Sequence, residues 1–144
     1  MILVDTNVLI YAVNRAAPQH RRVFAWWEAA LNGNEPIGLA WVATLGFLRV
    51  STNRKANPQS ISSDEAIAQI DEWLSYPNLR LVLETPDHWA VLRELVRETG
   101  MSGNRTTDAH LAALAISHNA TLASCDTDFG RFRRLRWVNP AAVG

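Results

Sequence analysis

The chain is poor in several features that would narrow its class. It has one cysteine, Cys125, so it cannot form an internal disulfide, and nothing indicates an oxidising compartment. It has no excess charge, because fourteen Lys and Arg residues balance fourteen Asp and Glu residues. Composition alone therefore points to neither a nucleic-acid nor a membrane partner. No apolar run approaches the ~20 residues of a membrane span, and the apolar N-terminus lacks the positively charged start of a signal peptide. We expect a cytoplasmic protein that does not enter a membrane.

What the chain does have is a regular alternation of short apolar runs and segments of helical periodicity. With 144 residues it is long enough for one domain and short for two, so we predict a single domain over residues 1–144. The pattern predicts strands at 2–4, 36–40, 79–83, 121–125 and 135–138, and helices at 18–32, 41–53, 62–76, 86–100 and 107–119. Three details go with these elements: Thr6 or Asn7 caps the segment after the first strand, Ser62 and Glu65 form a capping box, and one face of the helix from Pro86 carries Trp89, Leu92, Leu95 and Val96.

Strands that alternate with helices predict an α/β fold with a mostly parallel central sheet, covered by helices on both faces. Ligands of such sheets bind beyond the carboxyl ends of the strands. Asp5 is the first polar residue after the first predicted strand, and Asp126 follows the strand that ends at Cys125. Both aspartates are therefore candidates for a functional site.

Two more carboxylates join these candidates: Asp108, in the first turn of a late helix, and Asp128, two residues after Asp126. Each has a structural alternative, since an acid in a first helical turn is favoured by the helix dipole and aspartates are common in turns. Together they favour a metal site. Oxygen ligands with no His or Cys at ligand spacing indicate Mg²⁺ or Mn²⁺ rather than zinc, and such a site suits hydrolysis of phosphodiester bonds.

The segments "ILVDTNVLIYA", "TDAHLAALAISHNATLASCDTDFGRF" and "LRWVNP" resemble a PIN-domain ribonuclease, and more narrowly the VapC toxins of toxin–antitoxin pairs. The resemblance covers nearly the whole chain. It implies a PIN-like fold and a metal-dependent endoribonuclease, usually a homodimer, that cleaves RNA and is held inactive by a VapB-type antitoxin.

The resemblance also assigns roles to residues. Asp5, Asp108 and Asp126 match the family's catalytic, metal-binding positions, and Asp128 matches a further acidic position. Thr6 or Asn7 would orient Asp5, and Ser124 falls beside the site. These seven positions carry the expected chemistry.

One expected acid is missing. The family usually has a glutamate on the helix after the second strand, where this chain has Gly46, and no acid occurs anywhere from 36 to 63. Either the remaining aspartates suffice for activity, or catalysis is weak.

Basic residues follow the last acidic motif. Arg131, Arg133 and Arg134 are candidate RNA-phosphate ligands, with a solvated turn or an antitoxin carboxylate as alternatives. A second small polar cluster, Asn53 to Lys55, has the same ambiguity.

Two other functions are alternatives to a ribonuclease. A catalytically degenerate domain that only binds RNA or protein is kept open by Gly46. A receiver-type or phosphatase-type phosphotransfer domain fits poorly, because Lys55 is the only lysine and the first strand ends in Asp5-Thr6-Asn7 rather than Asp-x-Asp.

Overall fold

The computed structural model describes residues 1–142, so the last two residues of the predicted domain, 143–144, lie outside the described part. The elements follow one another as β1 (Ile2–Val4), α1 (Thr6–Val13), α2 (His20–Leu31), β2 (Ile37–Leu39), α3 (Trp41–Ser51), α4 (Ser63–Leu74), β3 (Leu79–Leu81), α5 (His88–Thr99), η1 (Gly103–Arg105), α6 (Thr106–Ser117), β4 (Thr121–Ala123), η2 (Thr127–Arg131) and β5 (Arg136–Val138).

The five strands form one sheet in the order β3-β2-β1-β4-β5, and every neighbouring pair is parallel. The predicted α/β fold with a parallel central sheet is therefore confirmed. β1 lies in the middle, where Leu3 pairs with Gly38 of β2 on one side and with Leu122 of β4 on the other. The carboxyl ends of β1 and β4 thus meet at one edge of the sheet.

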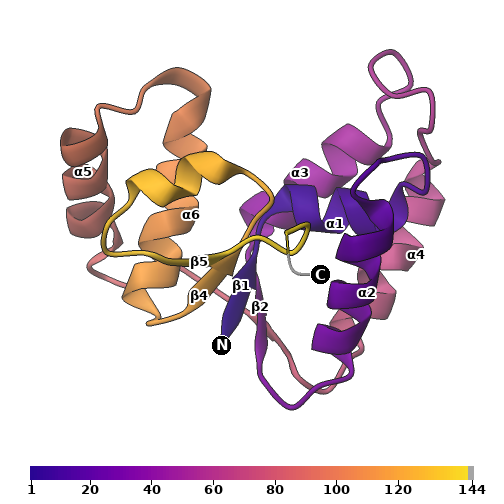
Figure 1. The fold of residues 1–144 in the computed structure, drawn as a ribbon, viewed down its shortest axis with the longest axis horizontal. Helices are drawn as coiled ribbons and strands as arrows, with labels where there is room; N and C mark the ends of the chain where they lie inside the picture. The colour runs from indigo at the N-terminus through magenta and orange to yellow at the C-terminus, as the bar shows by residue number, and fades with distance from the viewer. Residues whose placement is uncertain (143–144) are drawn as a thin grey trace.

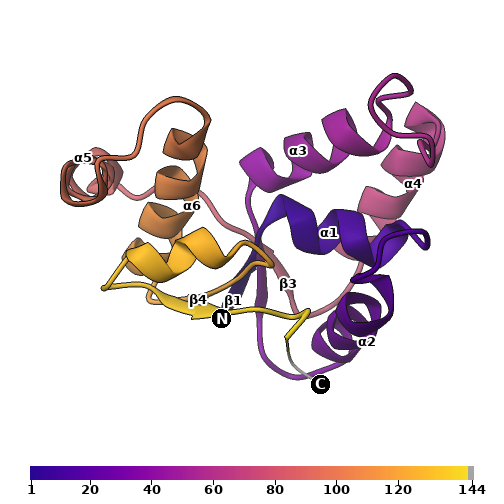
Figure 2. The same ribbon diagram turned by 45° about the horizontal axis from the view of Figure 1, so that its top comes forward.

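Helices cover both faces of the sheet. Successive strand residues point to opposite sides, so neighbouring residues of one strand belong to different cores. Val4 and Ala123 belong to a core shared with α1, α2, α3 and α4. Leu3 and Leu122 belong to a second core, built mainly from α6 with Leu95 of α5. Figures 1 and 2 show these two groups of helices on either side of the sheet, with α1 and α3 running outward together.

Most predicted elements are present with ends shifted by a few residues. The capping box of α4 is confirmed: the Ser62 hydroxyl accepts from the Glu65 amide at 3.1 Å, and the Glu65 carboxylate accepts from the Ser62 amide at 3.3 Å. α5 begins at His88 rather than Pro86 and ends before Gly100, whose φ of 67° closes the helix in the left-handed region.

One local prediction is wrong. Neither Thr6 nor Asn7 caps α1, because Asp5 itself is the N-cap and accepts a hydrogen bond from the Thr6 amide. On α5, Leu95 is buried, whereas 66% of Trp89 is exposed. Among residues 1–142, no helix is long and apolar enough to cross a membrane.

Candidate active site

The aspartates after β1 and β4 are brought together by the parallel register of the two strands. Val4 pairs with Ala123, and the amide of Asp5 donates to the Ala123 carbonyl at 3.0 Å. Asp5 and Ser124, the residues that follow β1 and β4, therefore lie side by side at the carboxyl edge of the sheet. This is the edge at which the sequence predicted a site.

Asp5 is held by three donors although it is almost fully buried, with 8% exposed. Its Oδ1 accepts from the Thr6 amide at 2.7 Å. Its Oδ2 accepts from the Ser124 hydroxyl at 2.7 Å and from Asn7 Nδ2 at 3.0 Å. Asn7 and Ser124 thus contact Asp5 through their side chains, whereas Thr6 does so through its backbone.

The same two polar side chains order the segment after β4. The Ser124 hydroxyl accepts from Asn7 Nδ2 at 3.1 Å and from the Asp126 amide at 3.0 Å. Asn7 Oδ1 accepts from the Cys125 amide at 3.0 Å. Asp126 in turn accepts at Oδ1 from the Asp128 amide at 2.9 Å, which starts η2. Ser124, Asp126 and Asp128, the polar candidates predicted after β4, therefore belong to one hydrogen-bond network with Asn7.

The four aspartates act on one another electrostatically. Burial raises the pKa of Asp5 above its ordinary value, the three hydrogen bonds partly offset it, and the negative charge of Asp126 adds to it. Burial is also the largest cause for Asp108, whose pKa rises from 3.8 to about 6. The charges of Asp5, Asp126 and Asp128 raise the pKa of Asp108 further. Asp108 at the start of α6 therefore faces the same space as the aspartates at the strand ends.

Arg105 is a site residue that the sequence reasoning missed. It ends η1, just before α6, and its Nη2 lies 2.5 Å from Asp128 Oδ2. It also lowers the pKa of Asp108, opposing the three aspartates. The available signal was that Arg105 lies three residues before Asp108, just ahead of the helix predicted from residue 107. Tyr11 of α1 was also missed; burial raises its pKa, and the nearby charges of Cys125 and Asp126 add to the shift.

The described part of the chain has no group of three or more His, Cys, Asp or Glu side chains close enough to hold one metal ion. The aspartates are therefore coupled through their charges without forming a closed set of ligands. Mg²⁺ tolerates such a site, because it keeps several waters and binds through one or two carboxylates plus substrate phosphates. The donor set fits a hydrated divalent cation and does not fit a closed structural site.

Gly46 is explained by its neighbour. It is buried in α3, and a Cβ at this position would lie 2.4 Å from Thr6 Oγ1 and 2.9 Å from Thr6 Cγ2. The Thr6 hydroxyl instead donates to the Ala43 carbonyl of α3 at 3.2 Å. The space where the family usually places a glutamate is therefore filled by Thr6, which packs α1 against α3.

The three candidate RNA-binding arginines lie beside the end of α5. Arg131, Arg133 and Arg134 line an open hollow together with Glu98 and Thr99 at the end of α5. Arg134 pairs with Glu94 of that helix at 3.1 Å. Within residues 1–142, none of the three is among the charges that shift the pKa of Asp5 or Asp108. The structure places a different arginine, Arg105, at the site.

The histidines of α6 join elements together. His110 Nδ1 and His88 Nε2 lie 2.9 Å apart, which links α6 to α5, and His110 Nε2 lies 3.6 Å from Glu84. Burial lowers the pKa of His110, and the charge of His88 lowers it further. His118 Nε2 contacts the Leu83 carbonyl at 2.7 Å. His110 and His118, the C-cap of α6, thus join this helix to α5 and to the segment after β3.

Comparison with known proteins gives a consistent result. The sequence profile of the PIN domain matches residues 2–135. Ribonuclease VapC33 of Mycobacterium tuberculosis is 42% identical over 140 residues, covering 97% of this chain and 98% of that protein. Ribonuclease VapC37 of the same species is 41% identical over 143 residues, covering 99% of each. Among solved structures, VapBC2 from Rickettsia felis bound to a promoter DNA fragment aligns with a TM-score of 0.71 at 21% identity, covering 96% of this chain and 98% of the matched chain.

Proposed function

This chain belongs to the PIN-domain family and is related over nearly its full length to VapC ribonucleases, and we propose that it is a metal-dependent endoribonuclease toxin. The observation that carries the proposal is the convergence of Asp5, Asp108, Asp126 and Asp128 at the carboxyl edge of β1 and β4, where their charges act on one another. Carboxylates whose negative charges repel one another are stabilised by a cation between them. We place this chemistry in a single PIN domain that works in the cytoplasm.

The carboxylates have different capacities to hold Mg²⁺ or Mn²⁺. Three of the lone pairs of Asp5 are already engaged by protein donors, and one oxygen of Asp126 accepts from the Asp128 amide. Within residues 1–142, Asp108 and the second oxygen of Asp126 accept no hydrogen bond, so we propose these two carboxylates as the groups that would hold the ion, with Asp5 and Asp128 adding negative charge beside it. When bound, such an ion supplies Lewis acidity toward a phosphate oxygen and hydroxide at neutral pH.

The chain's own residues hold and orient the reacting groups. Ser124 and Asn7 fix the rotamer of Asp5 through two hydrogen bonds to one carboxylate oxygen. Arg105 carries the positive charge that reaches Asp108, and it is half exposed, so it can exchange Asp128 for a substrate phosphate. Arg131, Arg133 and Arg134 are proposed to contact RNA phosphates farther from the cut.

The proposal is tested by cleavage of a labelled pool of structured RNA with magnesium, manganese or EDTA, comparing the wild type with Asp108→Asn purified identically. We expect metal-dependent cutting that falls by at least about 100-fold in the variant, because a principal charge of the site is lost. Equal activity of both proteins would identify a contaminating nuclease. Cleavage that persists in EDTA would contradict the metal dependence.

A VapB-type antitoxin is the proposed partner. The VapBC2 neighbour from Rickettsia felis is a toxin–antitoxin assembly, and the fold likeness supports the same kind of partner here. A homodimer is proposed as well, supported by large apolar side chains that are exposed on α3, on β3 and its following loop and on α5; they are Trp41, Leu45, Leu81, Leu83 and Trp89. Light scattering of the purified chain distinguishes a dimer from a monomer.

A catalytically degenerate binding module is the second candidate, and one observation favours it. Thr6 fills the place of the usual family glutamate, so this chain has one carboxylate fewer at the site. The same cleavage experiment decides between the candidates. A wild-type protein that binds RNA or its antitoxin without cutting would favour the degenerate module.

A further inference from the structure

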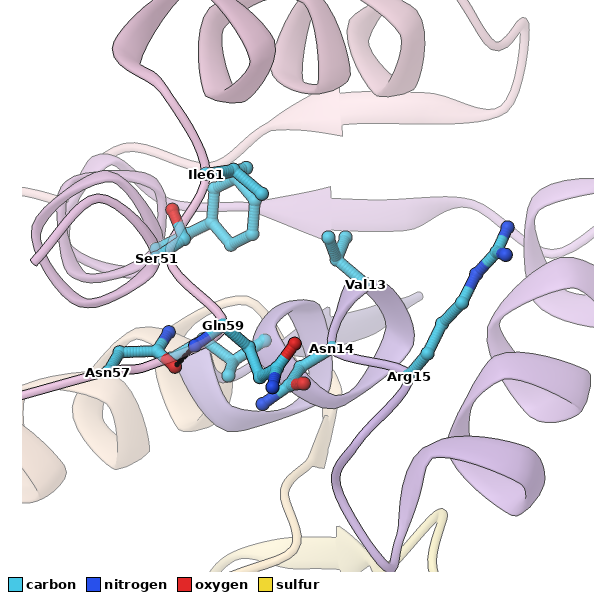
Figure 3. A pocket seen from close by; sticks show the side chains of 9 residues that line it. Val13, Asn14, Arg15, Ser51, Asn57, Gln59 and Ile61 are labelled. Atoms are coloured by element: carbon cyan, nitrogen blue, oxygen red, sulfur yellow. Dashed lines mark hydrogen bonds between the residues drawn. The ribbon is translucent and has the colours of Figure 1, made fainter. Parts of the chain in front are cut away.

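A second pocket lies away from the aspartates, between the outer ends of α1 and α3 and the loop that leads to α4. It has a volume of about 200 Å³. Four apolar side chains line it, namely Ile10, Val13, Phe47 and Ile61, together with five polar ones, namely Asn14, Arg15, Ser51, Asn57 and Gln59. Figure 3 shows Asn14 beside Gln59 and Asn57 next to it, while the Arg15 side chain extends away from this group. The pocket thus combines apolar walls with a cluster of side-chain amides.

One side chain that lines this pocket, Ser51, has a buried hydroxyl without a hydrogen-bond partner in the described part of the chain. Its side chain is 94% buried, since 6% is exposed, and its hydroxyl has no hydrogen-bond partner. A buried hydroxyl without a partner costs about 1–3 kcal/mol. Ser51 lines the pocket, and a turn of its buried side chain would bring the hydroxyl to a polar group bound there.

The amides at the pocket are oriented as donors. Asn14 Oδ1 accepts from the Ala16 amide at 3.1 Å, and Asn57 Oδ1 accepts from the Gln59 amide at 2.9 Å. These bonds leave each Nδ2 group available, and within residues 1–142 neither donates to a protein acceptor. The pocket therefore suits a ligand rich in hydrogen-bond acceptors.

The charge around the pocket is positive. No Asp or Glu lines it, and none occurs from residue 36 to 63. Arg15 lies at the pocket, and Arg54 and Lys55 lie on the loop beside it; all three are exposed and, in the described part of the chain, have no carboxylate within ion-pair distance. The nearest acids along the chain, Asp64 and Glu65, belong to the first turn of α4, where Glu65 closes the capping box. This surface fits a polyanion.

We propose that this pocket binds one base of the RNA strand whose cleaved phosphate lies at Asp5, so that it helps to select the cut site. The inference rests on the proposed ribonuclease function. Val13 lies eight residues after Asp5, which corresponds to about 12 Å along α1 at ~1.5 Å per residue. That distance corresponds to roughly three or four stacked nucleotides at ~3.4 Å each, so one strand can reach both places.

The chemistry favours a base over a peptide side chain. RNA is read in single-stranded segments, where bases are splayed out, contact apolar or aromatic side chains and are hydrogen-bonded along their edges. Every base edge carries acceptors for the two Asn amides and for Ser51, and the attached phosphates suit Arg15, Arg54 and Lys55. An apolar peptide side chain would fill the walls but would leave these donors without partners.

Binding is tested first without cleavage. The four ribonucleoside 5′-monophosphates are titrated into Asp108→Asn protein, and methyl signals of Ile10, Val13 and Ile61 are followed by NMR. We expect at least one nucleotide to shift these signals, with binding weakened about three- to tenfold by Ser51→Ala or Gln59→Ala. The matched control is Ser117→Ala, which removes another buried, unpartnered hydroxyl on α6, across the sheet, and should leave binding unchanged.

Specificity is tested by sequencing the cut sites in a randomised RNA pool. The wild type should prefer one base at a fixed distance from the cut, and Ser51→Ala should relax that preference and raise KM while kcat stays within about twofold. The proposal is overturned if no nucleotide shifts the pocket signals, if only an apolar peptide shifts them, or if Ser51→Ala cuts with the wild-type preference. Nucleotide binding by a wild type that cuts no RNA would support the pocket and refute the nuclease, so the two failures are distinguishable.

Discussion

The two sides of the acidic site are built in different ways. The strand side, defined as Asp5, Asn7 and Ser124, is a network in which one buried carboxylate has three donors at 2.7–3.0 Å. The helix side, defined as Arg105, Asp108 and Asp128, is partly exposed and has one ion pair. Asp108 there is shaped by neighbouring charges, which raise its pKa to about 6 together with burial. The protein itself fixes the strand side, whereas the helix side depends on a cation or a substrate to balance its charge.

The largest effect on stability should come from the strand side. Ser124→Ala removes one donor to Asp5 and the acceptor for the Asp126 amide, at a position with no exposed surface. We expect the free energy of unfolding to fall by about 2–3 kcal/mol, because hydrogen bonds to charged groups are lost and buried partners stay unmatched. Urea denaturation measures the change. A loss below about 0.5 kcal/mol, the range of an ordinary surface substitution, would show that the network is not rigid.

Substitution in the packing behind the strand side should lower the free energy of unfolding nearly as much as Ser124→Ala does. Gly46→Ala places a Cβ 2.4 Å from Thr6 Oγ1, so we expect a loss of about 1–3 kcal/mol from overpacking. Thr6→Ala removes the two closest atoms, and the double variant should recover part of the loss. The double-mutant cycle measures this coupling. Purely additive losses would mean that the backbone, rather than Thr6, closes the position.

The division between the strand side and the helix side also separates what the sequence could predict from what it could not. The strand side was largely visible in the sequence, because Asp5, Ser124 and Asp126 directly follow apolar runs, and parallel register brings such residues together. The sheet and its helices were visible for the same reason. The cap of α1 was misassigned because Asp5 fills two roles at once, as N-cap and as site carboxylate.

The rest depended on tertiary packing. That Thr6 occupies the space at Gly46 requires the contact between α1 and α3, which no local pattern reveals. The sequence emphasises the denser group Arg131, Arg133 and Arg134, which lies beside the end of α5, whereas Arg105 stands alone before α6. Side-chain direction in short loops is set by contacts distant in sequence, so charge spacing alone did not single out Arg105 as a neighbour of the acidic site.

On the helix side, the stability effect of Asp108→Asn should have the opposite sign. The folded pKa of about 6 lies above the ordinary 3.8, so at pH 7 the ionised carboxylate disfavours the folded state. Asn should raise the free energy of unfolding in EDTA by about 1 kcal/mol, a value reduced for solvent screening because Asp108 is partly exposed. As pH falls from 6 toward 3.8, the wild type takes up a proton on folding and the advantage of Asn disappears.

Magnesium provides the control for that result. A cation bound only by the folded wild type adds stability in proportion to its occupancy, so the Tm of the wild type should rise with magnesium and that of Asp108→Asn should rise less. Scanning calorimetry at pH 7 with and without magnesium measures both. If Asn destabilises the protein in EDTA, the charges of the aspartates do not repel as described.

The smallest stability effect is expected for Arg105→Ala, and it separates the two sides most clearly. Its ion pair with Asp128 is 47% and 30% exposed, so unfolding should change by less than about 0.5 kcal/mol. If Arg105 exchanges Asp128 for a substrate phosphate, RNA cleavage should nevertheless fall by about tenfold or more, and Arg105→Lys should restore only part, because lysine lacks the planar fork of donors. Arg131→Ala is the matched control, in which KM rises with little change in kcat. Equal losses for both variants would assign Arg105 to general RNA attraction, and the helix side would then contribute carboxylates alone.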